Sequence, residues 1–208
     1  MNQLYLVRHG HANYGLDCLT DLGIQQVNML GKKLERKFLS GVGYAIATSP
    51  SGRAVETANI LVPFIPNKSR LSIRLYNDPV FGELEESTFG LVTPHTTGRG
   101  EESTTKIKEY LGGTDVILVI AHSRLIGSTC QAIASHYNIE LPENLRMQES
   151  VEEVLIGFIM ESENVGREEA IKRILERGRT EKTLPRIGNA NAVFFDLDQM
   201  IAELIVPN

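Results

Sequence analysis

The chain has 208 residues, of which 42% are apolar and 23% are charged, and its 21 basic and 26 acidic residues give a net charge of −5. These values are ordinary for a globular domain, and a chain of this length can bury a core without disulfides. The acidic balance argues against a dedicated nucleic-acid-binding protein, which normally carries a basic excess. A few arginines could still form a local pocket for a small anion.

The cysteines and the apolar runs bear on the cellular setting. Cys18 and Cys130 are too few for a disulfide framework, so we expect a reduced, cytoplasmic setting. Residues 1–7 lack the basic head and the long apolar region of a signal peptide. The longest purely apolar run, residues 116–121, is too short to span a bilayer. We therefore expect no membrane partner.

In the first half of the chain, short apolar runs alternate with amphipathic stretches. We expect strands at residues 4–7, 44–48 and 71–75. A helix is predicted from Thr20, its N-cap, to about Phe38, and another from Ser51 or Gly52 to Leu61, before Pro63. The apolar stripe expected on the first helix consists of Leu22, Ile24, Val27, Leu30, Leu34 and Phe38.

The second half continues the alternation after a stretch rich in Thr, Gly and Pro, residues 88–100, which we expect to be a flexible loop. The elements predicted after it are a helix at 101–111, a strand at 115–121, a helix at 125–137 and a strand at 192–197. Strands that alternate with helices in this way are typical of an α/β fold with a mostly parallel sheet and helices on both faces.

Residues 142–182 interrupt this rhythm with two further amphipathic stretches. We interpret them as a helical insertion docked on the core. The whole chain, residues 1–208, is then a single domain with this insert.

Several chemically active residues follow the predicted strands. Ligands of parallel α/β sheets bind beyond the carboxyl ends of the strands. Arg8, His9, Gly10 and His11 follow the first strand, Arg53 lies just after the second, and His122 follows the strand at 115–121. Glu83, Glu85 and Glu86 lie between the last two groups. We expect these residues to meet at one edge of the sheet.

This combination suits phosphoryl transfer through a phosphohistidine. Guanidinium groups match phosphate oxygens, and an unprotonated imidazole nitrogen can attack phosphorus. A carboxylic acid can protonate the departing oxygen and later accept a proton from water. The chain shows no paired-ligand spacing of the kind that metal hydrolases use, so we expect no metal.

Four segments resemble the histidine phosphatase superfamily, also called the phosphoglycerate mutase-like family. They are residues 6–10 (LVRHG), 48–58 (TSPSGRAVETA), 86–90 (ESTFG) and 119–123 (VIAHS), and residues 189–192 also resemble the start of the family's last strand. The resemblance implies a mostly parallel sheet with one antiparallel strand, and no metal or other cofactor.

The resemblance also implies a role for each matching residue. His9 would be the nucleophile, and Arg8, Arg53 and His122 would bind the phosphate and stabilise the transition state. Glu86 would be the general acid and base, with Glu83 as the alternative. Gly10 and His11 are expected beside the substrate, although His11 reads equally well as an exposed loop residue.

The length of one segment separates the activities within the family. Only 35 residues lie between Glu86 and His122, too few for the long segment of the mutases, which favours a phosphatase. A phosphoglycerate mutase-type transfer and a non-catalytic phosphate-binding or scaffold protein stay as alternatives. We expect a small anionic phosphorylated substrate and no nucleic-acid partner, and a homo-oligomer stays open.

Overall fold

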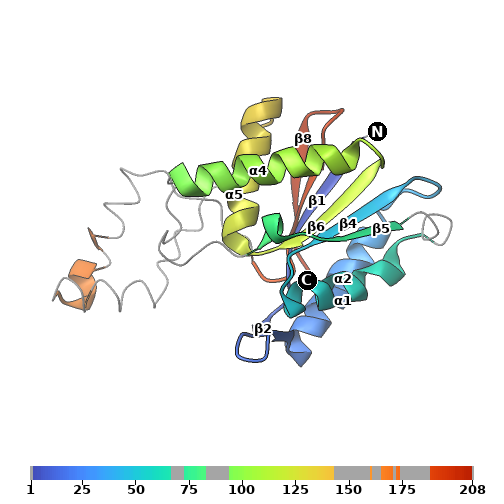
Figure 1. Cartoon of the computed structure of the whole chain (residues 1–208). Coiled ribbons are helices and arrows are strands. Elements are labelled where there is room, and N and C mark those ends of the chain that lie inside the picture. Colours follow the sequence, from blue (N-terminus) through green and yellow to red (C-terminus); the bar gives the residue numbers. More distant parts are fainter. Residues whose placement is uncertain are drawn as a thin grey trace.

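The computed structural model describes residues 2–66, 73–82, 94–142, 160, 165–170, 172–173 and 188–207. Its centre is a six-stranded sheet with the strand order β5-β4-β6-β1-β7-β8 (Figure 1). The strands are β1 (Gln3–Arg8), β4 (Tyr44–Thr48), β5 (Ile73–Asn77), β6 (Val116–Ala121), β7 (Ala192–Asp196) and β8 (Ile201–Ile205). The first four are parallel, and β7 is antiparallel to β1 and β8. The predicted α/β fold, mostly parallel with one antiparallel strand, is confirmed.

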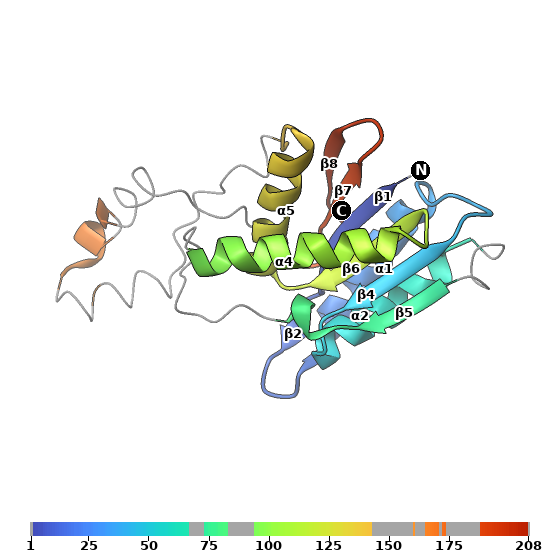
Figure 2. The ribbon, with the colours of Figure 1, turned by 45° about the horizontal axis from the view of Figure 1, so that its top comes forward.

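Helices cover both faces of this sheet. Successive side chains of a strand point to opposite faces, so an apolar strand needs a packing partner on each face. Tyr5 and Val7 pack in a core with helices α1 (Asp21–Glu35) and α2 (Gly52–Leu61). Leu4 and Leu6 pack in a second core with α4 (Pro94–Leu111) and α5 (Ser123–Tyr137). Figure 2 shows the two helix pairs on opposite sides of the sheet. The central parallel strands are therefore buried on both faces, as such strands usually are.

Helix α1 begins where predicted, but its buried face differs from the predicted stripe. The Thr20 hydroxyl caps the helix by accepting from the Gly23 N–H at 3.2 Å. Leu22 and Ile24 are exposed, so their predicted burial is wrong. A Cβ on Gly23 would lie 2.0 Å from the His11 carbonyl oxygen. The helix therefore packs against the backbone of His11 through Gly23, and the neighbouring Leu22 and Ile24 face outward.

Helix α4 begins earlier than predicted. Residues 94–100, part of the expected flexible loop, are helical, and that part of the prediction is wrong. A Cβ on Gly100 would lie 2.3 Å from the Ser128 hydroxyl on α5, so this glycine serves close packing of two helices. Residues 88–93 lie outside the described part of the chain.

The sequence patterns did not predict several other elements. They are the hairpin of β2 (Ala12–Asn13) and β3 (Cys18–Leu19), strand β8, and the short 3₁₀ helices η1 (Val62–Phe64) and η2 (Pro79–Phe81). Strand β5 also ends two residues later than expected, and α5 starts two residues earlier. Two or three residues are too few to show a hydrophobic period, and β8 is a half-exposed edge strand.

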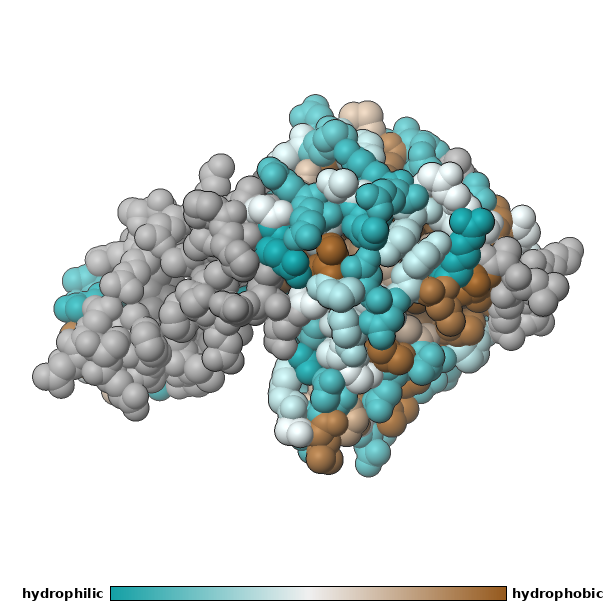
Figure 3. Space-filling view, in the orientation of Figure 1, coloured by the Kyte–Doolittle hydropathy of each residue, from teal (hydrophilic) through white to brown (hydrophobic). Residues whose placement is uncertain are grey.

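The predicted insert, 142–182, lies mostly outside the described residues. Within it, residues 167–170 and 172–173 are helical. On the face shown in Figure 3, hydrophilic residues predominate and apolar residues form small separate groups. None of the described helices has the length and apolar character that crossing a membrane requires.

Candidate active site

Three of the predicted residues meet at the carboxyl edge of the sheet. His9 follows β1, His122 follows β6, and Arg53 lies in the first turn of α2, after β4. They are 2%, 3% and 6% exposed, respectively. The Arg53 Nε–H donates to His9 Nε2, and Arg53 Nη2 donates to His122 Nδ1, both at 3.4 Å. The guanidinium therefore joins the two imidazoles along one of its edges.

The hydrogen bonds of His9 assign its protonation state. Its Nδ1 lies 2.7 Å from the Gly10 carbonyl oxygen, which can only accept, so Nδ1 carries the proton. Nε2 is then unprotonated and accepts from Arg53. Burial, together with the charges of Arg8 and Arg53, lowers the pKa of His9 from 6.5 to about 4. At neutral pH the ring is uncharged, and its lone pair is on Nε2, where it accepts the long contact from Arg53.

His122 is held in a matching state. Its Nδ1 accepts from Arg53, so Nε2–H is the donor to the Ser49 hydroxyl at 2.8 Å. Burial, with the nearby His9 and Arg53, lowers its pKa to about 3. The ring is therefore neutral, with its single N–H on Nε2 and a lone pair on Nδ1.

Two residues that the sequence patterns did not single out also contact Arg53. Asp17 Oδ1 lies 2.5 Å from Arg53 Nη1, and Asp17 Oδ2 accepts from the Gly52 N–H at 2.6 Å. Burial would raise the pKa of Asp17, but these two hydrogen bonds outweigh it and hold the pKa below 3.8. The Tyr14 ring lies 5.0 Å from Arg53 Cζ. Both residues come from the β2–β3 hairpin. No local sequence pattern predicts that this hairpin packs against α2.

The remaining predicted residues lie in different places. Arg8 ends β1, and its charge contributes to the lowered pKa of His9. The Gly10 N–H donates to the Thr57 hydroxyl at 3.3 Å. His11 is exposed, and its Nδ1 lies 2.8 Å from the Thr20 hydroxyl. Glu83, Glu85 and Glu86 lie outside the described residues. The substrate contacts predicted for Gly10 and His11 stay predictions.

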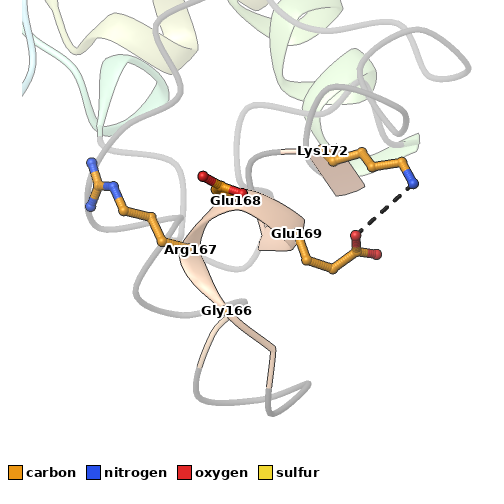
Figure 4. Close-up of a pocket in the computed structure, with 5 residues that line it drawn as sticks. All are labelled: Gly166, Arg167, Glu168, Glu169 and Lys172. Atoms are coloured by element: carbon orange, nitrogen blue, oxygen red, sulfur yellow. Dashed lines mark ion pairs between the residues drawn. The ribbon is translucent and has the colours of Figure 1, made fainter.

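A hollow lies in the described part of the insert, shown in Figure 4. Its lining consists of Gly166, Arg167, Glu168, Glu169 and Lys172. Lys172 lies 4.0 Å from the Glu169 carboxylate, which also accepts from Arg173 at 3.0 Å. Among the described residues, two acidic and two basic side chains line this hollow, and none of the predicted catalytic residues does so.

Comparison with known proteins gives a family match over the N-terminal part of the chain. Residues 4–89 match the model of the histidine phosphatase superfamily (branch 1). The mitochondrial serine/threonine-protein phosphatase Pgam5 of Caenorhabditis elegans is 35% identical over 66 residues, which are 31% of this chain and 22% of that protein. The match thus spans about a fifth of that relative.

Solved structures share the fold at low sequence identity. A mycobacterial glucosyl-3-phosphoglycerate phosphatase superposes with a TM-score of 0.53 at 16% identity, covering 100% of this chain and 99% of that one. A variant of the phosphoserine phosphatase of Entamoeba histolytica gives 0.53 at 15%, covering 98% and 95%. SixA of Agrobacterium tumefaciens gives 0.51 at 12%, also covering 98% and 95%. The family match over residues 4–89 and the shared α/β fold together confirm the resemblance of this chain to the histidine phosphatase superfamily.

Proposed function

We propose that the protein is a metal-independent phosphatase that hydrolyses a phosphate monoester through a phosphohistidine on His9. The observation that carries the proposal is the uncharged His9 ring, whose unprotonated Nε2 adjoins the Arg53 guanidinium. A nucleophile needs this lone pair, and the oxygens of an in-line transition state need fixed positive charge nearby.

The proposed reaction has two steps. In the first, the Nε2 lone pair attacks phosphorus, a P–N bond forms, and the P–O bond to the alcohol breaks. Glu86 gives its proton to the departing oxygen. In the second, water attacks phosphorus and passes a proton to the Glu86 carboxylate, the P–N bond breaks, and inorganic phosphate leaves. Arg8, Arg53 and His122 bind the phosphoryl oxygens throughout.

The assignment of Glu86 rests on its spacing from Gly90, and Glu83 is the alternative. Asp17 is the carboxylate in contact with the described cluster, but its lowered pKa keeps it ionised at neutral pH. An ionised carboxylate has no proton to give a leaving group. The general acid is therefore one of the glutamates at 83, 85 and 86.

The short segment between Glu86 and His122 and the activities of the relatives favour hydrolysis over a mutase reaction. The 35 residues between Glu86 and His122 are too few for a mutase segment. The relatives named above include phosphatases of a protein, of glucosyl-3-phosphoglycerate and of phosphoserine, so their substrates differ. We therefore propose a small anionic phosphate monoester as the substrate class, without nucleic-acid or membrane partners.

The test is phosphoryl labelling with p-nitrophenyl phosphate carrying ³²P. We expect turnover in the presence of a chelator, and acid-labile label on the protein after rapid quenching, which marks a P–N bond. Inorganic phosphate binding without turnover or label would instead make the protein a phosphate-binding or scaffold protein. Activity abolished by the chelator would contradict metal independence.

A further inference from the structure

The β2–β3 hairpin is fastened to α2 by side chains rather than by the sheet. The Asp17 carboxylate contacts both the Gly52 N–H and Arg53 Nη1. The Glu56 carboxylate on the next turn of α2 accepts from the Leu19 N–H at 2.7 Å. The N-cap of α2, Ser51, makes no side-chain cap of its own, so Asp17 caps the helix from 35 residues away.

Each nitrogen of the Arg53 guanidinium has a different contact. Nε and Nη2 form one edge of the planar group and face His9 and His122. Nη1 lies at the remaining corner and contacts Asp17. The carboxylate thus holds the corner that does not face the two imidazoles. A phosphoryl group in front of His9 Nε2 would take over the Nε–H and Nη2–H contacts that the imidazoles now accept, while Nη1 stays with Asp17.

An arginine side chain has several rotatable bonds, and ordering it costs side-chain entropy. A guanidinium binds phosphate most strongly when two parallel N–H groups meet two oxygens. A partner that fixes the guanidinium before the anion arrives removes part of this cost from binding. The Asp17 contact at Nη1 and the Tyr14 ring over Cζ both restrain the group in this way.

We propose that Asp17 is a positioning residue that directs the Nε–Nη2 edge of Arg53 at the phosphoryl group. This inference deepens the proposed function and rests on it for the place of the phosphoryl group. The opposite role is that Asp17 occupies the cation as an internal anion and competes with phosphate. The two roles predict opposite changes in phosphate affinity.

The experiment measures the dissociation constant of inorganic phosphate by calorimetry, together with turnover of p-nitrophenyl phosphate. Asp17→Asn is the main variant, because its amide oxygen can still accept from the Gly52 N–H while the charge facing Arg53 is lost. Asp21→Asn, an exposed aspartate in the first turn of α1, is the matched control. Both variants are repeated in an Arg53→Lys background, which lacks the two-nitrogen edge.

We expect Asp17→Asn to weaken phosphate binding about tenfold in the wild-type background, which corresponds to the loss of one well-oriented charged contact. In the Arg53→Lys background we expect less than a twofold change, because Asp17 acts through the guanidinium. A purely structural role would cost the same in both backgrounds, and that result would overturn the proposal. Tighter phosphate binding by Asp17→Asn would overturn it in favour of competition.

A second measurement tests the proposal even if Asp17→Asn is less stable than the wild type. Thermal unfolding of Asp17→Asn is followed with and without 20 mM phosphate, a concentration of roughly the millimolar order at which weak sites fill. We expect phosphate to stabilise the wild type more than the variant, and an equal shift in both would overturn the proposal. Wild-type protein that binds phosphate but turns over no ester would defeat the proposed function and leave the role of Asp17 intact.

Discussion

Arg53 donates its Nε–H to His9 Nε2 across 3.4 Å, although 44 residues separate the two in sequence. The contact is long for a hydrogen bond, and it places a permanent positive charge beside an uncharged nitrogen lone pair. Two requirements of phosphoryl transfer, an unprotonated nucleophilic nitrogen and a cation for the phosphoryl oxygens, thereby lie side by side.

Replacement of His9 by alanine tests the nucleophile. We expect His9→Ala to lose turnover of aryl phosphates by at least about 10³-fold, since no other group would carry the phosphoryl (P–N) bond. Phosphate inhibition constants should stay within about tenfold of the wild type, because Arg8 and Arg53 still offer their charges. The control is His136→Ala, an exposed histidine on α5. Substantial residual turnover in His9→Ala would refute the assignment.

Removal of the Arg53 side chain should weaken phosphate as well as slow the reaction. Arg53→Ala loses the guanidinium and leaves the Asp17 carboxylate, whose charge then repels an anion. We expect the competitive inhibition constant of inorganic phosphate to rise by about 100-fold, measured in steady-state assays. Arg36→Ala, at the exposed end of α1, serves as the matched control. An unchanged constant would exclude Arg53 from the binding site.

The general acid is tested by varying the leaving group. Glu86→Gln should slow alkyl phosphates far more than p-nitrophenyl phosphate, by about 10²-fold or more in relative rate, because nitrophenolate leaves without a proton. Glu83→Gln is the paired variant, and the selective loss should follow whichever glutamate is the acid. If both esters are slowed equally in both variants, neither glutamate donates the proton.

The two buried imidazoles predict a loss of stability in acid. The folded protein keeps them neutral down to about pH 4 for His9 and about pH 3 for His122, whereas the unfolded chain protonates them near 6.5. Between these values the unfolded state binds more protons, so the free energy of unfolding falls as the pH falls from 6.5 toward 4. We expect a decrease on the order of 1 kcal/mol per pH unit for each ring.

Urea unfolding at pH 7, 6 and 5 measures this decrease. His122→Asn should flatten the pH dependence because it removes one of the two titrating rings. His136→Asn, which changes an exposed ring, should leave the slope as it is in the wild type. Equal slopes in all three proteins would mean that the buried rings are protonated at the same pH in the folded and unfolded states.

A pair of glycine substitutions tests the packing that positions residues 9–11. Gly→Ala inside a helix usually stabilises by up to about 1 kcal/mol. We expect Gly98→Ala in α4 to follow that rule, since no atom of the described residues lies within 4 Å of the added Cβ. Gly23→Ala should instead destabilise by about 1–3 kcal/mol, because its Cβ would meet the His11 carbonyl oxygen at 2.0 Å. Thermal unfolding measures both changes, and a stabilised Gly23→Ala would contradict this packing.

Local pattern was sufficient for the α/β alternation and for the residues that end β1 and β6. A buried strand shows as an apolar run, and Thr20 as an N-cap is a short-range signal, so both could be identified without tertiary information. The meeting of His9, Arg53 and His122 could also be predicted, because parallel strands deliver their carboxyl ends to one edge. Glu86 stays a prediction from the motif alone.

The sequence by itself therefore determined the order of β1, β4, β5, β6 and β7 and of the helices between them, though not β2, β3 or β8. It also predicted that His9, Arg53 and His122 meet at one edge of the sheet. Only the tertiary structure decided that Gly23, rather than Leu22 and Ile24, packs α1 against the His11 backbone, and that residues 94–100 extend α4. It also decided that Asp17 contacts Arg53, 36 residues away. Hydrophobic periodicity and capping act within a few residues, whereas close helix contacts and ion pairs depend on how distant segments approach one another, which no local pattern encodes.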